Sequence, residues 1–479
     1  MFNGQERIIL SIVVIVYFVF LFGVSLYINN RKIKTYDDYN VAGRSVSLIP
    51  LILTFVGTAI GGATLLGYMT NGFSLGMGQQ WLNIGGLIAG VLMASLLVKR
   101  IRLLGEKHNM VTIGDFTALR YGEGARIPTV ISILVAYCAI TGMQFVAIAT
   151  ILNLTVGINM TTGIVISWIL LTLKTYFGGL KSVIWQDAIH GTIQTLGIFV
   201  LFFVVLFVAG DWTSMSQYAN SFGESSNLSI LGIAPSEVFI YLFTIGAYQF
   251  VRQDLWQRFW AAKDLKTTMY GYWGSVAVGF LIGGFVIAIG VFGRYGLRLE
   301  NAEPTLIYYE VISYVFNFPL VIIMIVALLA TVISCADSFF MAGSSSIIND
   351  IIKPRLREAE DSKLLRYSRY SVIIVSVFAL VLALYIPELV NLWVTGTAML
   401  VSGLLAPVMF GLFWKGATRT AGVLSMWLGL IIAVIWQVTG HPFGLHPVFI
   451  GLPLSILTLL ITSFITKQND EENYLSEAK

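Results

Sequence analysis

Charged residues are scarce in this sequence, and their scarcity excludes a water-soluble globular protein. Only 11% of the 479 residues are Asp, Glu, Lys or Arg, whereas 57% are hydrophobic. Soluble domains carry about 25% charged residues, so one soluble core could not hide this much apolar surface. The net charge of +4 comes from positive residues in short loops. It therefore gives no reason to expect a nucleic-acid partner.

The sequence also lacks the motifs of common enzymes and pumps. The two cysteines, Cys138 and Cys335, both lie in apolar runs. We expect small buried residues there, although a disulfide between them stays open. Cys and His show no zinc-ligand spacing. No GxxxxGK[ST] run occurs, so this chain lacks the nucleotide-binding motif that ATP-driven pumping would need. We predict no enzymatic activity.

What the chain does contain is a series of apolar runs of about 20 residues, the length that crosses a bilayer. The first run lacks a small-residue cleavage site, so we expect a retained transmembrane helix rather than a signal peptide. No soluble domain is predicted between the runs. The thirteen predicted spans are 7–28, 48–70, 76–98, 127–152, 158–177, 182–209, 235–251, 269–293, 318–347, 368–386, 390–413, 419–440 and 446–466.

Basic residues sort by side of the membrane when the connecting loops are assigned alternately to opposite faces. One set of loops holds 26 of the 29 basic residues, and the other holds only Arg7, Arg294 and Arg298. The positive-inside rule makes the first set cytoplasmic. We predict a multi-pass protein of the cell membrane, with its N-terminus outside and its C-terminus cytoplasmic.

Two predicted spans carry polar and small residues in an unusual density. The second span has four glycines between Gly57 and Gly67, with Thr58 and Thr64 among them. Such glycines allow close helix packing, or let a helix unwind so that freed carbonyls bind a cation. In the ninth span, Thr331, Ser334, Cys335 and Ser338 share one helical face. Membrane Ser and Thr often bond to their own helix, but four on one face favour an oxygen-lined cation site.

Two carboxylates, Asp187 and Asp337, are predicted within the hydrocarbon depth. An ionised Asp there costs roughly 2.5–3.5 kcal/mol, so a cation, a proton or a partner must offset it. Asp187 could instead lie at the cytoplasmic interface, and Asp337 could make a structural hydrogen bond. His190, one turn beyond Asp187, is expected to be a packing residue rather than a proton relay.

The motif GGLKSVIWQDAIHGTIQTLGIF at 178–199 resembles the signature of the sodium/solute symporter family. This family contains sodium-coupled proline, pantothenate, sialic acid and sugar transporters. Residues 37–76, 248–271 and 330–351 are similar to its first core helix, its sixth core helix with the following loop, and its eighth core helix. The resemblance runs in order over about residues 37–415.

The resemblance implies an all-α membrane protein built on an inverted five-plus-five helix repeat of the LeuT type. One helix precedes the repeats and two follow them. The implied segments are a leading helix and loop at 1–47, the first repeat at 48–209, an extracellular loop at 210–234, the second repeat at 235–415, two trailing helices at 416–466 and a cytoplasmic tail at 467–479.

The resemblance also implies a first sodium site, in which backbone carbonyls of Gly57 and Ile60 meet Thr331, Ser334 and Cys335. The family usually has a hydroxyl at the position of Cys335, and a thiol is a poor sodium ligand. A second cation site would contain Asp187, Asp337 and Ser338. Two carboxylates there either bind a cation or share a proton, so proton coupling competes with sodium coupling.

By position, five residues of the core helices would face a central cavity and contact the solute: Thr64, Asn83, Gln144, Tyr248 and Gln249. The alternative for each is a hydrogen bond between helices. We expect no basic residue in these faces. The solute would be a small polar molecule of the amino acid, sugar, vitamin or monocarboxylate class.

These observations predict a sodium-coupled symporter that imports its solute by alternating access, with Na⁺ as coupling ion. The partners are the solute and the lipid bilayer, and no obligate protein partner is predicted. A proton-coupled symporter, a transporter-derived solute sensor and a passive channel are the alternatives.

Overall fold

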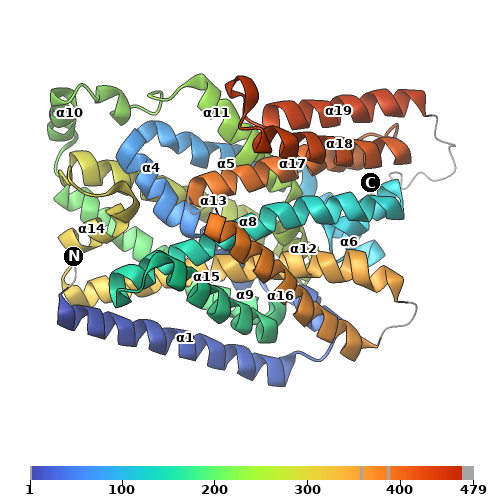
Figure 1. The fold of residues 1–479 in the computed structure, drawn as a ribbon, viewed down its shortest axis with the longest axis horizontal. Helices are drawn as coiled ribbons and strands as arrows, with labels where there is room; N and C mark the ends of the chain where they lie inside the picture. Colours follow the sequence, from blue (N-terminus) through green and yellow to red (C-terminus); the bar gives the residue numbers. More distant parts are fainter. Residues whose placement is uncertain (1–2, 357–359, 386–388, 467–479) are drawn as a thin grey trace.

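The structure, a computed structural model, describes residues 3–356, 360–385 and 389–466. Within these ranges the chain is helical and contains no β-strand (Figure 1), which confirms the predicted all-α class. Helices satisfy every backbone hydrogen bond within one segment, as the hydrocarbon of a bilayer demands. The predicted tail at 467–479 lies outside the described residues.

Ten helices of the described part are long and apolar enough to cross a membrane, and a bent pair makes an eleventh. The bent pair is α3 (Leu48–Ala59) with α4 (Tyr68–Leu75), at an angle of 60°. The other main helices are α1 (Gly4–Lys32), α5 (Gln80–Leu92) continuing through Met93–Leu97 into α6 (Val98–His108), α8 (Arg126–Val156), α9 (Met160–Val208), α13 (Leu265–Tyr295), α15 (Phe318–Ser346), α16 (Asp361–Tyr385), α17 (Leu389–Phe413), α18 (Arg419–Val438) and α19 (Val448–Ile465).

Helix α9 contains the predicted spans 158–177 and 182–209 in one element of 49 residues. At 1.5 Å per residue, a straight helix of that length would measure about 74 Å, more than twice the hydrocarbon thickness. Gly179 divides it, with φ 59° and ψ 176°. A side chain at Gly179 would also collide with the ring of Tyr39. The two predicted spans therefore meet at a kink rather than at a loop.

The predicted span 235–251 is helical over its whole length, although its winding changes along it. Helix α11 (Pro235–Tyr241) continues into a π-helical stretch at Leu242–Gly246 and ends in a 3₁₀ turn at Gln249–Val251, after which α12 (Gln253–Ala261) begins. The remaining short helices are α2 (Tyr36–Val41), α7 (Ile113–Tyr121), α10 (Trp212–Ser221) and α14 (Ile307–Val315).

Helix α15 lies at the centre of the bundle. Its residues from Ala327 to Ser346 are all buried, and it packs against α3, α8 and α9. Helix α1 packs on α8 and α9 at one side, whereas α18 and α19 pack on α17 at the other (Figure 1). The polar face of α15 therefore meets α3 and α9 deep inside the protein.

Candidate functional site: a broken helix, a hydroxyl stripe and a cavity

The chain between α3 and α4 leaves the helical path at Ile60, which is extended with φ −108° and ψ 98°. Gly61 and Gly62 follow, and neither has room for a side chain. A Cβ atom on Gly61 would collide with the sulfur of Cys335, and one on Gly62 would lie 2.8 Å from Cβ of Ala147. The freed N–H of Gly62 donates to Oε1 of Gln144 at 2.8 Å. Close packing thus explains why this membrane helix breaks here.

The break in α3 and the hydroxyl stripe of α15 are in direct contact. A Cβ atom on Gly57 would lie 2.6 Å from Oγ of Ser334. The thiol of Cys335 donates to the carbonyl of Thr58 at 3.6 Å, and the hydroxyls of Thr58 and Ser338 are 2.8 Å apart. The last carbonyls of a helix have no partner within it, so oxygens of α3 are free to face α15.

Gly57, Ser334 and Cys335 of the predicted first sodium site are thus brought together, and the carbonyl and hydroxyl oxygens of these two segments fit a sodium ion chemically. Neutral carbonyl and hydroxyl oxygens are ligands that hard cations prefer. Thr331 donates its proton to its own helix, to the carbonyl of Ala327 at 2.7 Å, which leaves lone pairs on its oxygen. Among the described residues, no cluster of three or more His, Cys, Asp or Glu side chains forms a metal site.

Asp187 lies beside this pocket and is fully buried. Its carboxylate accepts hydrogen bonds from Ser334 and, at 2.5 Å, from Thr54. The guanidinium of Arg258, also fully buried, lies 3.5 Å from the same carboxylate and donates to Ser338 at 2.6 Å. The charge of Asp187 is therefore balanced by a basic residue of the chain. Asp187 is thus enclosed and paired within the protein rather than exposed to solvent.

Asp337 faces a different element. One carboxylate oxygen forms an ion pair with Lys174, and the other accepts a hydrogen bond from Thr175 at 2.8 Å. Lys174 and Asp337 are buried, with 4% and 1% of their side chains exposed. The two carboxylates of the predicted second cation site thus hold separate basic partners, and no hydroxyl group bridges them. His190 is buried nearby, 6.1 Å from the ring of Tyr17.

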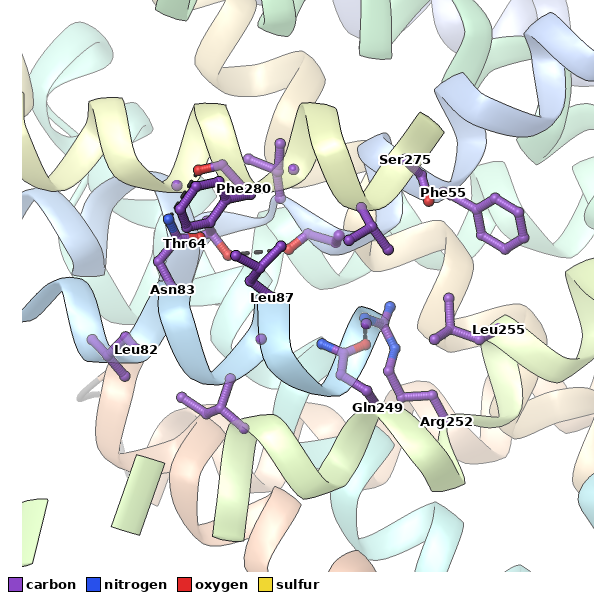
Figure 2. Close-up of a pocket in the computed structure, with 18 of the residues that line it drawn as sticks. Phe55, Thr64, Leu82, Asn83, Leu87, Gln249, Arg252, Leu255, Ser275 and Phe280 are labelled. Carbon is purple, nitrogen blue, oxygen red and sulfur yellow. Dashed lines mark hydrogen bonds between the residues drawn. The ribbon is translucent and has the colours of Figure 1, made fainter. Parts of the chain in front are cut away.

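A cavity of about 110 Å³ adjoins the α3 break. Figure 2 shows Thr64, Asn83 and Phe280 grouped at one part of its wall, with Gln249 and Arg252 together at another. Of the five predicted solute contacts, Thr64, Asn83 and Gln249 line this central cavity. Asn83 is also anchored to α13 through a 2.9 Å hydrogen bond to the carbonyl of Phe280.

The other two predicted contacts do not line the cavity. Gln144 supports the α3 break, as described above. Tyr248 is buried against Arg252, whose guanidinium lies 5.3 Å from the centre of its ring. For these two side chains, packing between elements describes the geometry better than contact with a solute in the central cavity.

The expectation that no basic residue enters the core faces was wrong. Arg252 lines the cavity, bound to Asp254 at 2.6 Å and to Oε1 of Gln249 at 3.2 Å. Alternate assignment of the connecting loops places Arg252, Arg258 and Lys174 on the cytoplasmic side instead of in the core. For Lys174 a signal was present, because it lies inside the predicted apolar span 158–177.

Known proteins resemble the chain over almost its full length. The sodium/proline symporter of Staphylococcus aureus (strain JH9) is 26% identical and is matched over 95% of this chain and 93% of the relative. Two solved structures share the fold. One is a sodium-coupled sialic acid symporter in a substrate-bound outward-open state, at TM-score 0.81 and 18% identity, covering 96% of this chain and 99% of that one. The other is Mhp1, a nucleobase-cation-symport-1 family transporter, in a closed conformation, at TM-score 0.60 and 14% identity, covering 92% and 97%.

These structural neighbours confirm the predicted LeuT-type architecture. The sequence itself matches a family of transporters, the sodium:solute symporters, over residues 39–429. This match spans most of the helices described above, including the α3 break, both halves of α9 and the hydroxyl stripe of α15. The chain is accordingly a member of the sodium:solute symporter family.

Proposed function

We propose that this protein is a sodium-coupled secondary active symporter that imports a small polar solute by alternating access. One observation carries the proposal. Ile60 ends α3 beside the hydroxyl stripe of α15, and the same residue lines the central cavity together with Ala59 and Thr64. An ion bound at the α3 break and a solute in the cavity would therefore share one flexible segment.

A segment shared by the ion and the solute would supply the physical basis for coupling sodium binding to solute binding. Sodium can favour solute binding only if it binds one conformation better than the other. At the first sodium site, an ion would hold Gly57 and Ile60 against Thr331, Ser334 and Cys335. The position of the α3 break would then set the shape of the cavity wall at Thr64. The sodium-coupled transport of proline and sialic acid by the two relatives supports this proposal.

The lining of the cavity favours a small polar solute. Asn83, Thr64 and Ser275 supply neutral hydrogen-bonding groups. Arg252 also lines the wall, but its guanidinium is paired with Asp254 at 2.6 Å and bonded to Oε1 of Gln249 at 3.2 Å. Because this charge is balanced within the protein, the wall offers hydrogen bonds rather than a net charge to the solute.

The proposal includes a location and an orientation. The protein would span the cell membrane many times with its N-terminus outside. The acidic 467–479 segment would be cytoplasmic. Substituted cysteines near Asn3 and in the 210–234 loop should react with a membrane-impermeant maleimide in intact cells. Labelling only after the cells are opened would reverse the orientation.

The test of function is transport by purified protein in proteoliposomes. A thermal-shift screen of amino acids, monocarboxylates, sugars and vitamins, with NaCl or choline chloride, first identifies the solute. Uptake of that solute should then follow an imposed inward sodium gradient and should ignore a proton gradient. Uptake driven by the proton gradient alone would favour the proton-coupled alternative. Failure of labelled solute to exchange in counterflow would favour a sensor or a channel.

A further inference from the structure

Lys174 is a buried ammonium for which the proposed transport cycle has no role so far. It lies in the first half of α9, before the kink at Gly179. Its ammonium pairs with Asp337 of α15, and Thr175 occupies the other oxygen of that carboxylate at 2.8 Å. A charged amine in the core of a membrane protein is costly, and its pairing with a carboxylate offsets that cost.

The predicted second cation site is entirely occupied by basic side chains of the protein. Lys174 pairs with Asp337, while Arg258 contacts both Asp187 and Ser338, at 3.5 and 2.6 Å. Two carboxylates thus face two basic side chains, and the formal charges of the cluster balance. A sodium ion entering there would add a positive charge to a neutral, buried cluster. It would also have to displace an ammonium from Asp337.

The first sodium site is not blocked in this way. Its proposed ligands are neutral oxygens of Gly57, Ile60, Thr331 and Ser334. Thr331 donates to the carbonyl of Ala327 and Ser334 to Asp187, and within the described part of the chain no hydrogen bond from a basic side chain to these oxygens is found. Ser334 and Ser338 lie one helical turn apart on α15, and Ser334 faces Gly57 at the end of α3. Asp337 projects from α15 toward α9, where Lys174 meets it.

We propose that Lys174 is a tethered cation that fills the second cation site, so that the protein couples transport to a single sodium ion. An ammonium is a compact point charge with three donors, and it can stand where a monovalent cation would bind two carboxylate oxygens or hydroxyls. This inference rests on the proposed function, because it sets the ion stoichiometry of the same transport cycle.

The test counts sodium ions with ²²Na⁺ alone, by equilibrium binding to the purified full-length protein at constant ionic strength. The wild type should bind one ion per chain. Lys174→Ala removes the tethered cation, leaves Asp337 without a counter-charge, and should bind two. Lys174→Gln keeps a hydrogen-bond donor for Asp337 and so protects folding, and it should also bind two. The double variant Lys174→Gln/Asp337→Asn removes the demand for a cation and should bind one.

Lys181→Gln is the matched control, because Lys181 lies on the same helix but pairs with Asp38 outside the core. It should bind one ion. Two ions bound by the wild type, or one ion bound by Lys174→Gln, would overturn the inference and leave the proposed symport intact. No saturable binding by the wild type would instead contradict the proposed function itself.

Discussion

Small residues allow the two segments of the proposed first sodium site to meet. Gly57 and Gly61 present no side chain toward α15, and Ser334 and Cys335 take the space that a Cβ atom would need. Glycine in a membrane helix often serves close packing alone. Here close packing and a break in the helix occur together, so backbone oxygens come within reach of side-chain oxygens.

Gly57→Ala tests this contact. The added methyl would lie 2.6 Å from Oγ of Ser334 and 3.8 Å from Cβ of Asp187, so the pocket must distort. Overpacking costs about 1–3 kcal/mol, which corresponds to a rise of about 5- to 150-fold in the sodium concentration for half-saturation. The measurement is a ²²Na⁺ titration. Gly23→Ala is the control, because its added Cβ would meet nothing within 4 Å.

Cys335→Ser tests the ligand chemistry of the same pocket. A hydroxyl oxygen binds sodium better than a thiol sulfur, so the variant should bind sodium more tightly. One polar contact is worth about 0.5–1.5 kcal/mol, so we expect the sodium concentration for half-saturation to fall about 2- to 12-fold. Cys138→Ser should leave it unchanged, because that thiol contacts the carbonyl of Val375 instead. Unchanged or weaker binding by Cys335→Ser would remove Cys335 from the site.

The sequence predicts that residues of α3 and α15 lie together, but it does not predict which charged side chains surround them. The hydroxyl face of α15 follows from helical spacing, and the α3 break follows from dense glycine. The basic partners of Asp187 and Asp337 cannot be predicted in this way. Arg258 lies 71 residues from Asp187 along the chain, and Lys174 lies 163 residues from Asp337. Counting positive residues by membrane side places such side chains in loops, although an ion pair lets them enter the core.

At the scale of elements, the length of the apolar runs predicts which segments are helices long enough to cross a membrane. It does not predict how consecutive helices are joined. The predicted spans 158–177 and 182–209 correspond to the two parts of α9, and only the φ of Gly179 separates them. The predicted span 235–251 is helical throughout, but its winding changes at Leu242–Gly246 and at Gln249–Val251. Such local changes of winding depend on packing against other helices, which a single sequence does not display.

The segment that joins α10 to α11 is fastened to α13 by an ion pair. Glu224 accepts hydrogen bonds from Arg294 at 2.6 Å and from Tyr295 at 2.8 Å. Burial of the carboxyl opposes its ionisation, but the hydrogen bonds from Tyr295 and Arg294 outweigh burial and lower the pKa of Glu224. A lowered pKa means that the attachment is stabilised while Glu224 is ionised.

We therefore predict a pH dependence with a defined sign for this attachment. Its stabilisation should be complete above the unfolded pKa of a glutamate, about 4.3, and should be lost as the pH falls through the lower folded pKa. Limited proteolysis of the 222–234 segment should be constant from pH 8 to pH 5. Glu224→Gln should speed cleavage at neutral pH, whereas Glu300→Gln, at an exposed position, should not. Equal cleavage rates in both variants would contradict the prediction.

At the scale of the whole molecule, membership of a family of transporters confirms that the chain is not an enzyme. The central helix α15 contacts α3, α8 and α9, and the ion site and the central cavity both adjoin the α3 break. A small change of conformation at the break can therefore alter the packing of several helices in the bundle. Coupling free energies between two sites are typically about 1–3 kcal/mol, enough to change solute affinity about 5- to 150-fold.

The central claim is that the α3 break and the hydroxyl stripe of α15 together form the sodium site. Saturable ²²Na⁺ binding to purified protein tests it most directly, comparing the wild type with Ser334→Ala and with Ser344→Ala. Ser344 lies on the same helix but donates to the carbonyl of Ser368, away from the break. We predict saturable binding by the wild type and Ser344→Ala and none by Ser334→Ala at the same sodium concentrations. Equal binding by all three proteins would contradict the account.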